Sequence, residues 1–237
     1  MTTKLAWIST WAAALCLLGC DGFGIDGNGQ REVETREVEA FSRVRNDSEL
    51  DLQIQQGEER AVKVSLDSNL IPLVRTHVAD GTLFIGLDDN VDEMLRGPHL
   101  TITVPELSAV KLAGSGNVEL SLEQPDKPLD VYVTGSGNVS FAGSAAALGA
   151  YLDGSGDIRL AGAAQDVDIR LNGSGDIRAR DLDAKSASIE LNGSGDVAAN
   201  VSDSVSVSLS GSGDVDLYGG AHIDSYRHDG SGDIVTH

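Results

Sequence analysis

The sequence has little positive charge, few aromatic residues and little proline. Only 17 Lys+Arg stand against 37 Asp+Glu, so the formal net charge is −20, and aromatic residues make up 4%. This balance argues against a binder of nucleic acid or anionic membrane surfaces, because phosphate groups would be repelled. The 28 glycines come with only 5 prolines, which excludes a collagen-like chain. With 41% hydrophobic residues, the composition predicts an ordered, acidic β protein with repeated tight turns.

The first 19 residues are typical of an export signal. Lys4 precedes an apolar run of 14 residues, 5–18. This run is too short for a membrane-spanning helix, which needs about 20 residues. The run ends in LLGC, which resembles the lipobox of bacterial lipoproteins, in which the cysteine is acylated and becomes the new N-terminus. We therefore predict a lipoprotein signal peptide over residues 1–19 and lipidation of Cys20. A buried N-terminal core helix is the alternative.

Processing at this position would leave residues 20–237, 218 in all, with a net charge of −21. Since the one remaining cysteine would carry lipid, neither a disulfide nor a cysteine-based metal site could form. The acyl chains would hold the protein on a membrane of the bacterial cell envelope, facing the periplasm or the surface. Residues 20–36 are rich in glycine and charge without an apolar period, which predicts a flexible tether.

The strongest feature of the sequence is a tetrapeptide, GSGN or GSGD, that occurs seven times. Successive copies begin 21, 19, 19, 20, 18 and 19 residues apart. A fixed period near this length is typical of solenoids and other stacked arrays. The copies span residues 114–117, 135–138, 154–157, 173–176, 193–196, 211–214 and 230–233.

Apolar and polar residues alternate on both sides of every copy. The position two residues before the copy, for example, holds Leu112, Val133, Leu152, Leu171, Leu191, Leu209 and His228. This period of two indicates strands and excludes helices. We predict an all-β fold, a parallel β-helix or β-solenoid over residues 110–237 with coils of about 19 residues; a sandwich of hairpins is the alternative. The motif glycines share the parity of the apolar positions, so we expect them to point inward, where the missing side chain lets the wall bend or lets the opposite wall approach closely.

Residues 37–109 show the same alternation without the tetrapeptide. Because a solenoid needs caps over its open ends, this segment is predicted to form irregular first rungs and the N-terminal cap of one continuous domain, 37–237. The last rung has no obvious cap, which leaves an edge open for oligomer formation. Strands are predicted at 49–55, 61–66, 82–87 and 100–104, and a short helical turn, ended by Pro72, at 69–73.

Several blocks of the chain are similar to a known family. They are the QG of 56–57, the DGTLFI of 80–85, the VPEL of 104–107 and the repeated GSG[ND]. Over residues 38–233 the chain resembles the family of the putative auto-transporter adhesin, head GIN domain. Members are typically bacterial and exported, often lipoproteins, with β-helical structures resembling pectin-lyase-type folds. The resemblance therefore implies this fold, an envelope location and a role in adhesion, and it brings no agreed catalytic residues.

Stacking would place the last residue of every copy in one outward line. Neighbouring carboxylates about 5 Å apart repel by roughly 1 to 3 kcal/mol, so the line needs a counterbalance. One interpretation is local: Gly and Ser N–H groups of the turn donate to the carboxylates, with Arg159 or Arg178 nearby. The other is a cation or ligand ladder, since Ca²⁺ binds rows of carboxylate oxygens. The line comprises Asn117, Asn138, Asp157, Asp176, Asp196, Asp214 and Asp233.

The serine of each copy would form a second outward line. A catalytic serine needs a positioned base, and no base recurs beside these serines. We interpret them as a structural ladder, hydrogen bonded between rungs, and predict no catalytic residues and no firm metal site. The serines are Ser115, Ser136, Ser155, Ser174, Ser194, Ser212 and Ser231.

These features favour a non-catalytic, lipid-anchored structural, adhesive or binding protein without a required cofactor. Its expected partners are the membrane, through Cys20, and a cell-surface or polysaccharide ligand, but not nucleic acid. The first alternative is a polysaccharide-acting enzyme, a lyase or hydrolase, with Arg159, Arg170 and Arg178 near the aspartate line as candidate cations. The second is a calcium-binding module. A functional site usually breaks local consistency, and the repeats show no evident break.

Overall fold

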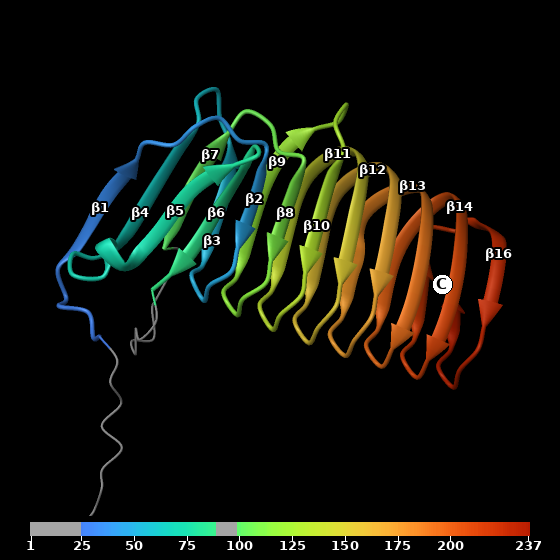
Figure 1. The fold of residues 1–237 in the computed structure, drawn as a ribbon. Coiled ribbons are helices and arrows are strands. Elements are labelled where there is room, and N and C mark those ends of the chain that lie inside the picture. The colour runs from blue at the N-terminus through green and yellow to red at the C-terminus, as the bar shows by residue number, and fades with distance from the viewer. Residues whose placement is uncertain (1–24, 89–98) are drawn as a thin grey trace, which may run out of the picture.

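The computed structural model describes residues 25–88 and 99–237, in which strands are almost the only regular secondary structure. They form a β-solenoid of about seven turns, with parallel coils of about 19 residues stacked along one axis (Figure 1). The predicted fold class is confirmed. Within these ranges no helix has the length and apolar character needed to cross a bilayer. The predicted signal peptide and Cys20 lie outside the described residues.

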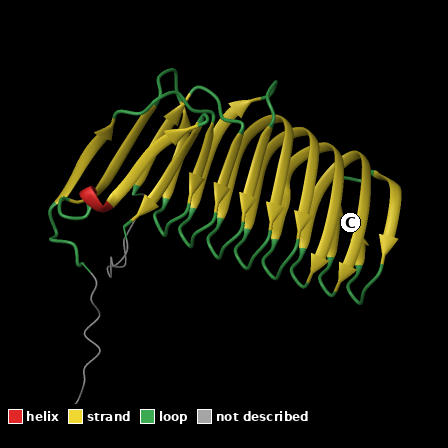
Figure 2. Ribbon diagram, in the orientation of Figure 1, coloured by secondary structure: helices red, strands yellow, loops and turns green. Residues whose placement is uncertain are grey.

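The tetrapeptide turns line one edge of the solenoid, where two sheets meet (Figure 2). We call the strands before each tetrapeptide the entry sheet and those after it the exit sheet. The strands of the central coils bend over the far side and belong to both sheets. The entry sheet contains β8 (Ala109–Leu112), β10 (Leu129–Val133) and β16 (His222–His228); the exit sheet contains β9 (Val118–Gln124), β15 (Val215–Tyr218) and β17 (Ile234–Thr236); and β11 (Val139–Leu152), β12 (Ile158–Leu171), β13 (Ile177–Gly193) and β14 (Val197–Gly211) span both.

Equal repeat positions lie over one another in the stack. The column two residues before the tetrapeptide runs through Val133, Leu152, Leu171, Leu191 and Leu209, which pair coil by coil. Each of these side chains is 0% exposed. The predicted alternation therefore marks the core correctly, because each apolar column is buried between the two sheets.

The motif glycines are required by the close stacking of neighbouring coils. A Cβ atom added to Gly175 would overlap the carbonyl oxygen of Gly156, and one added to Gly156 would overlap that of Gly137. The obstacle is the main chain of the preceding coil. Of the two expected reasons for these glycines, approach of the opposite wall is not the one seen, because the nearest atoms belong to the preceding coil. The second glycine of every copy is buried as predicted.

The N-terminal coils are stacked out of chain order. β2 lies between β6 and β8, and β3 lies between β7 and β9, with all neighbours parallel. The first coil in the chain is thus inserted between two coils that follow it. These strands are β2 (Arg43–Asn46), β3 (Leu52–Gln56), β6 (Thr82–Leu87) and β7 (Leu100–Val104).

Antiparallel strands close this end of the parallel stack. β5 (Val74–Ala79) pairs with β6, and β4 (Ala61–Asp67) pairs with β7. β1 (Arg31–Arg36) then pairs with β4. A 3-10 turn over Ile71–Leu73 precedes β5, and Pro72 lies within this turn instead of ending it.

The predicted tether ends before residue 36, because residues 31–36 form β1. This strand pairs with β4 from Arg31 opposite Asp67 to Arg36 opposite Val62. Arg36 also donates from Nη2 to the carbonyl oxygen of Ile71 at 2.9 Å. The apolar residue of the strand, Val33, is 66% exposed, so no alternation marks this edge strand in the sequence.

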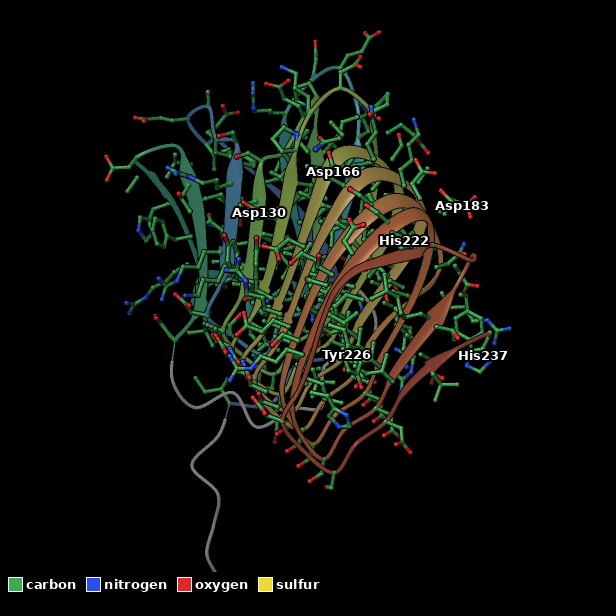
Figure 3. The ribbon with its side chains drawn as sticks, turned by 90° about the vertical axis from the view of Figure 1, so that its right-hand side faces the viewer. Asp130, Asp166, Asp183, His222, Tyr226 and His237 are labelled. Atoms are coloured by element: carbon green, nitrogen blue, oxygen red, sulfur yellow. The ribbon has the colours of Figure 1, made fainter. Side chains whose placement is uncertain are left out.

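The last coil carries polar residues in the inward columns. Tyr226 and His228 pair with Val207 and Leu209 of the preceding coil, and Tyr226 is 58% exposed. The Tyr226 hydroxyl lies 3.2 Å from His228 Nδ1 on the end of the stack that faces the viewer in Figure 3. Such replacements reduce the apolar surface of a terminal repeat. Pairing of this edge with another copy stays a prediction.

Candidate functional site

The carboxylates of the repeat form a hydrogen-bonded column along the tetrapeptide edge, which we call the aspartate column. From Asp157 to Asp233, the Oδ1 atom in one coil accepts the main-chain N–H of the equivalent aspartate in the next, whereas Asn138 donates to Asn117 Oδ1 from its side-chain Nδ2 at 2.9 Å. Asn138 Oδ1 accepts the N–H of Asp157 in the same way, at 2.9 Å, so an amide oxygen also serves. The N···O distances are 3.1 Å from Asp176 to Asp157, 2.9 Å from Asp196 to Asp176, 2.9 Å from Asp214 to Asp196, and 2.7 Å from Asp233 to Asp214.

The aspartate column begins one coil before the first tetrapeptide. Asp51 Oδ1 accepts the N–H of Asn117 at 2.7 Å. A Cβ on Gly114 would overlap the main chain of Ser48, so residues 48–51 (SELD) stack directly against the first GSGN. The sequence contains one trace of this degenerate copy: Asp51 precedes an alternating LQIQ just as Asn117 precedes VELS.

These hydrogen bonds supply the local counterbalance that adjacent carboxylates need. The donor differs from the expected one, because it is the aspartate N–H of the next coil. The turn N–H groups bond instead to main-chain carbonyls of the preceding coil, as Ser174 N does to Gly154 O at 3.0 Å. The stack therefore uses both the side chains and the main chain of the tetrapeptide.

The motif serines are exposed and form no continuous ladder. In the described part of the chain, one hydrogen bond joins two of them, from Ser231 Oγ to Ser212 Oγ at 3.2 Å. Residues 25–88 and 99–237 also contain no group of three or more His, Cys, Asp or Glu side chains arranged to hold a metal ion. The calcium ladder is thus a hypothesis for experiment.

A groove of about 580 Å³ crosses the exit sheet. Small side chains of β9, β11, β12 and β14 line it, together with Tyr218, three arginines and two carboxylates: Arg159, Arg178, Arg180, Glu119 and Asp181. We call this feature the arginine groove. Two of the three cations singled out in the sequence, Arg159 and Arg178, lie in it, and Arg180 was missed.

The repeat is interrupted at the arginine groove. Between β12 and β13 the pairing moves from Arg159–Arg178 to Ala161–Asp181, so β13 carries one extra residue. This β-bulge leaves Arg180 and Asp181 both exposed, where strict alternation would bury one of them. The bulge corresponds to a spacing of 20 followed by one of 18 between tetrapeptides. The expectation of an unbroken repeat is therefore wrong here.

Arg178 is fixed by two members of the aspartate column. Its Nη1 lies 2.8 Å from Asp157 Oδ2 and its Nη2 lies 2.6 Å from Asp176 Oδ2. Partial burial raises the pKa of Asp157, but the hydrogen bonds from Arg178 and from the Asp176 N–H, with the charges of Arg178 and Arg159, outweigh it and lower that pKa overall. Asp157 thus holds the next coil with Oδ1 and the groove arginine with Oδ2.

Arg180 is held by stacking. Its guanidinium carbon lies 4.4 Å from the centroid of the Tyr218 ring. Tyr218 stacks in turn on His237, with centroids 4.3 Å apart, and His237 Nε2 lies 2.7 Å from Asp216 Oδ1. Across the described ranges, no carboxylate forms an ion pair with Arg180. The Tyr218 ring, and not a carboxylate, therefore positions this guanidinium group.

Arg170 lies on the entry sheet, away from the arginine groove. It pairs with Asp168 at 3.0 Å, and its guanidinium carbon stands 5.4 Å from the centroid of Tyr151. Grouping Arg170 with Arg159 and Arg178 is therefore wrong. β12 bends over the far side of the coil between Arg159 and Arg170, so these two residues lie on different sheets. Burial, followed by the hydrogen bond to Asp168, raises the pKa of Tyr151 to about 12.

Asp130→Asn is expected to stabilise the protein near neutral pH. Burial raises the pKa of Asp130, the hydrogen bond with Tyr132 opposes this, and the charge of Asp168 adds to it. A carboxyl group whose pKa is higher in the folded than in the unfolded state lowers the free energy of unfolding at a pH above both values. This loss of stability disappears as the pH falls through the folded-state pKa and the group becomes protonated. We expect the Tm to rise by about 1–3 °C at neutral pH and the gain to vanish in acid. An unchanged Tm, matching the control Asp126→Asn at an exposed position, would contradict this.

Comparison with known proteins agrees with this architecture. The model of the family described as putative auto-transporter adhesin, head GIN domain, matches residues 40–221. No curated protein matches the sequence. A putative adhesin from Bacteroides fragilis NCTC 9343 has a TM-score of 0.83 and 25% identity, over 90% of this chain and 100% of that one. A putative lipid binding protein from Parabacteroides distasonis ATCC 8503 has a TM-score of 0.71 and 22% identity, over 90% and 99%.

The family match includes the N-terminal coils, the degenerate SELD copy and six of the seven tetrapeptides. A second P. distasonis protein, a putative adhesin, shares the fold with a TM-score of 0.67 and 22% identity, over 90% of this chain and 100% of that one. Since the family model covers well over half of the sequence, the chain belongs to the putative auto-transporter adhesin, head GIN domain family.

Proposed function

We propose that the protein is a lipid-anchored, non-catalytic binding protein of the bacterial cell envelope, which adheres to its partner through an outer face of the solenoid. The observation that carries this proposal is the arginine groove, where the repeat is interrupted and Arg180 is exposed. The carboxylates of the tetrapeptides, by contrast, are bonded within the stack. Relatives described as adhesins and as a lipid binding protein support binding over catalysis.

Cys20→Ser is expected to move the protein from the membrane fraction to the soluble fraction. Without the thiol no acyl chain can be attached, and the described residues contain no helix that could replace it. Cell fractionation and labelling with a palmitate analogue measure the change. Cys16→Ser is the matched control and should stay with the membranes and keep the label. Retention of the palmitate label by Cys20→Ser, or membrane retention of Cys20→Ser from which residues 1–19 have been removed, would overturn the anchor.

A polysaccharide-acting enzyme is the second candidate, favoured by the presence of Arg159 and Arg178 in one groove. We expect that incubation with polygalacturonate releases no new chain ends. Release of chain ends that Arg178→Ala abolishes would replace the binding role with a catalytic one.

A further inference from the structure

We propose that the arginine groove binds an acidic polysaccharide, with Arg178 and Arg180 as the main contacts to its carboxylate or sulfate groups and Arg159 as a further cation. The inference rests on the proposed binding function and assigns the ligand class and the site. Guanidinium groups pair with carboxylate and sulfate-like oxygens through two parallel hydrogen bonds, which gives geometric selectivity.

The first argument is the concentration of cations in a strongly acidic protein. The last five coils, residues 139–237, contain six Lys and Arg residues, and three of them lie in this one groove, where they outnumber its two lining carboxylates, Glu119 and Asp181. Arg159 and Arg178 are direct neighbours across β12 and β13. Two neighbouring positive charges repel each other unless a negative charge close to both offsets the repulsion. Here Asp157 holds both: its Oδ2 lies 2.8 Å from Arg178 and 3.4 Å from Arg159.

The second argument is preorganisation. Arg178 is fixed by two ion pairs, and Arg180 by stacking on Tyr218, which itself rests on His237. A ligand therefore meets guanidinium groups that have already lost much of their side-chain entropy. The β13 bulge places Arg180 here, and such bulges commonly re-aim a side chain at a functional site.

The third argument is the shape of the groove, which suits a chain rather than a compact ligand. Its lining crosses six strands, from β9 to β15, so at a rung spacing of about 4.8 Å it extends roughly 24 Å along the solenoid. Small side chains, including Ser121, Ser140 and Ala161, keep this path low and provide hydroxyl groups that can bond to sugars. The groove lies on the exit sheet, which is the side on which Figure 3 labels His237. Asp130, on the entry sheet, lies on the opposite side.

The fourth argument separates a polysaccharide from a lipid. The large apolar residues along the groove are Leu120, Phe141 and Leu160, and each is only 2% exposed. More apolar than polar surface lines the groove, but it belongs to small side chains such as Ala142 and Ala161, to Tyr218 and to the stems of the arginines. An acyl chain therefore finds no slot between large apolar side chains, while the guanidinium groups stay accessible. The chemistry therefore favours a polar, anionic chain over a phospholipid.

The test uses the full mature chain with Cys20→Ser, which carries no lipid and needs no detergent, so that vesicle binding reports on the groove and not on the anchor. Binding to four immobilised probes is measured. These are polygalacturonate for carboxylates, dextran sulfate for sulfates, dextran as the neutral polymer, and phosphatidylglycerol vesicles as the lipid source of anionic groups. We expect one or both acidic polymers to bind, dextran and vesicles not to bind, and the affinity to fall as salt rises. Arg180→Ala should weaken binding about fivefold and Arg178→Ala/Arg180→Ala at least about tenfold.

Arg170→Ala is the matched control, an exposed arginine on the other sheet, and should change the affinity less than about twofold. Arg180→Ala breaks no ion pair, so it tests the groove even if the double variant unfolds. Equal binding of dextran and the acidic polymers, tightest binding to vesicles, or equal losses in Arg170→Ala and Arg180→Ala would each overturn the proposal without touching the anchor. Cleavage of the bound polymer would instead overturn the non-catalytic function and leave the groove assignment standing.

Discussion

Gly175→Ala is expected to cost about 3–5 kcal/mol of the free energy of unfolding, the range of the most damaging single substitutions. The new Cβ would overlap the carbonyl oxygen of Gly156 in the preceding coil, and main chain, unlike a flexible side chain, cannot rotate away. To accept the methyl group, the two coils must separate at the tetrapeptide edge. That would stretch the hydrogen bond from the Asp176 N–H to Asp157 and the packing beside it.

The matched control is Gly86→Ala in β6. A Cβ at Gly86 has no heavy atom within 4 Å, and its φ is not in the left-handed region. We expect this change to stay within about 0.5 kcal/mol of the parent protein. Thermal unfolding followed by circular dichroism measures both variants. Similar melting temperatures for Gly175→Ala and Gly86→Ala would contradict the close stacking of the tetrapeptides.

Replacing Asp196 and Asp214 together by alanine is expected to cost about 2 kcal/mol, whereas asparagine at both positions should cost nothing or stabilise the protein. Their Oδ1 atoms accept the N–H groups of Asp214 and Asp233 at 2.9 and 2.7 Å. Alanine removes both acceptors. Asparagine keeps a carbonyl acceptor, as Asn138 does naturally, and it removes two like charges from the aspartate column.

Salt dependence distinguishes the hydrogen bonds of the column from its charge. Added NaCl screens the repulsion between carboxylates, so the Tm of the parent protein should rise more than that of the asparagine variant. The alanine variant should remain the least stable at every salt concentration, because screening does not replace a lost acceptor. An asparagine variant as unstable as the alanine variant would show that the carboxylate charge itself is required.

The repeating part of the fold could be predicted because every coil repeats the same local rule. Inward columns such as Leu152, Leu171 and Leu191 are apolar in nearly every copy. Parallel stacking places residues at the same repeat position over one another in neighbouring coils. The same regularity placed the aspartates on the outer edge. Their actual bonding partner was not predictable, because the N–H that binds Asp157 belongs to Asp176, 19 residues away in another coil.

The irregular parts depend on contacts between coils that no local pattern records. β1 is an edge strand whose side chains are mostly exposed, so pairing with β4 alone defines it. The insertion of β2 between β6 and β8 reverses the order expected from the chain. The stack of Arg180, Tyr218 and His237 draws on three coils. The change in tetrapeptide spacing from 20 to 18 residues was the available trace of the groove.

The central claim is that the aspartate column holds neighbouring coils together and that ligand binding takes place on an outer face of the solenoid. Calorimetric titration of the mature chain with Ca²⁺, combined with measurement of its Tm, tests this claim most directly. We expect no heat of binding and an unchanged Tm, because the Oδ1 atoms between coils already accept main-chain N–H groups and Arg178 engages Oδ2 of Asp157 and Asp176. Micromolar binding with a large rise in Tm would contradict the claim and make the column a cation ladder.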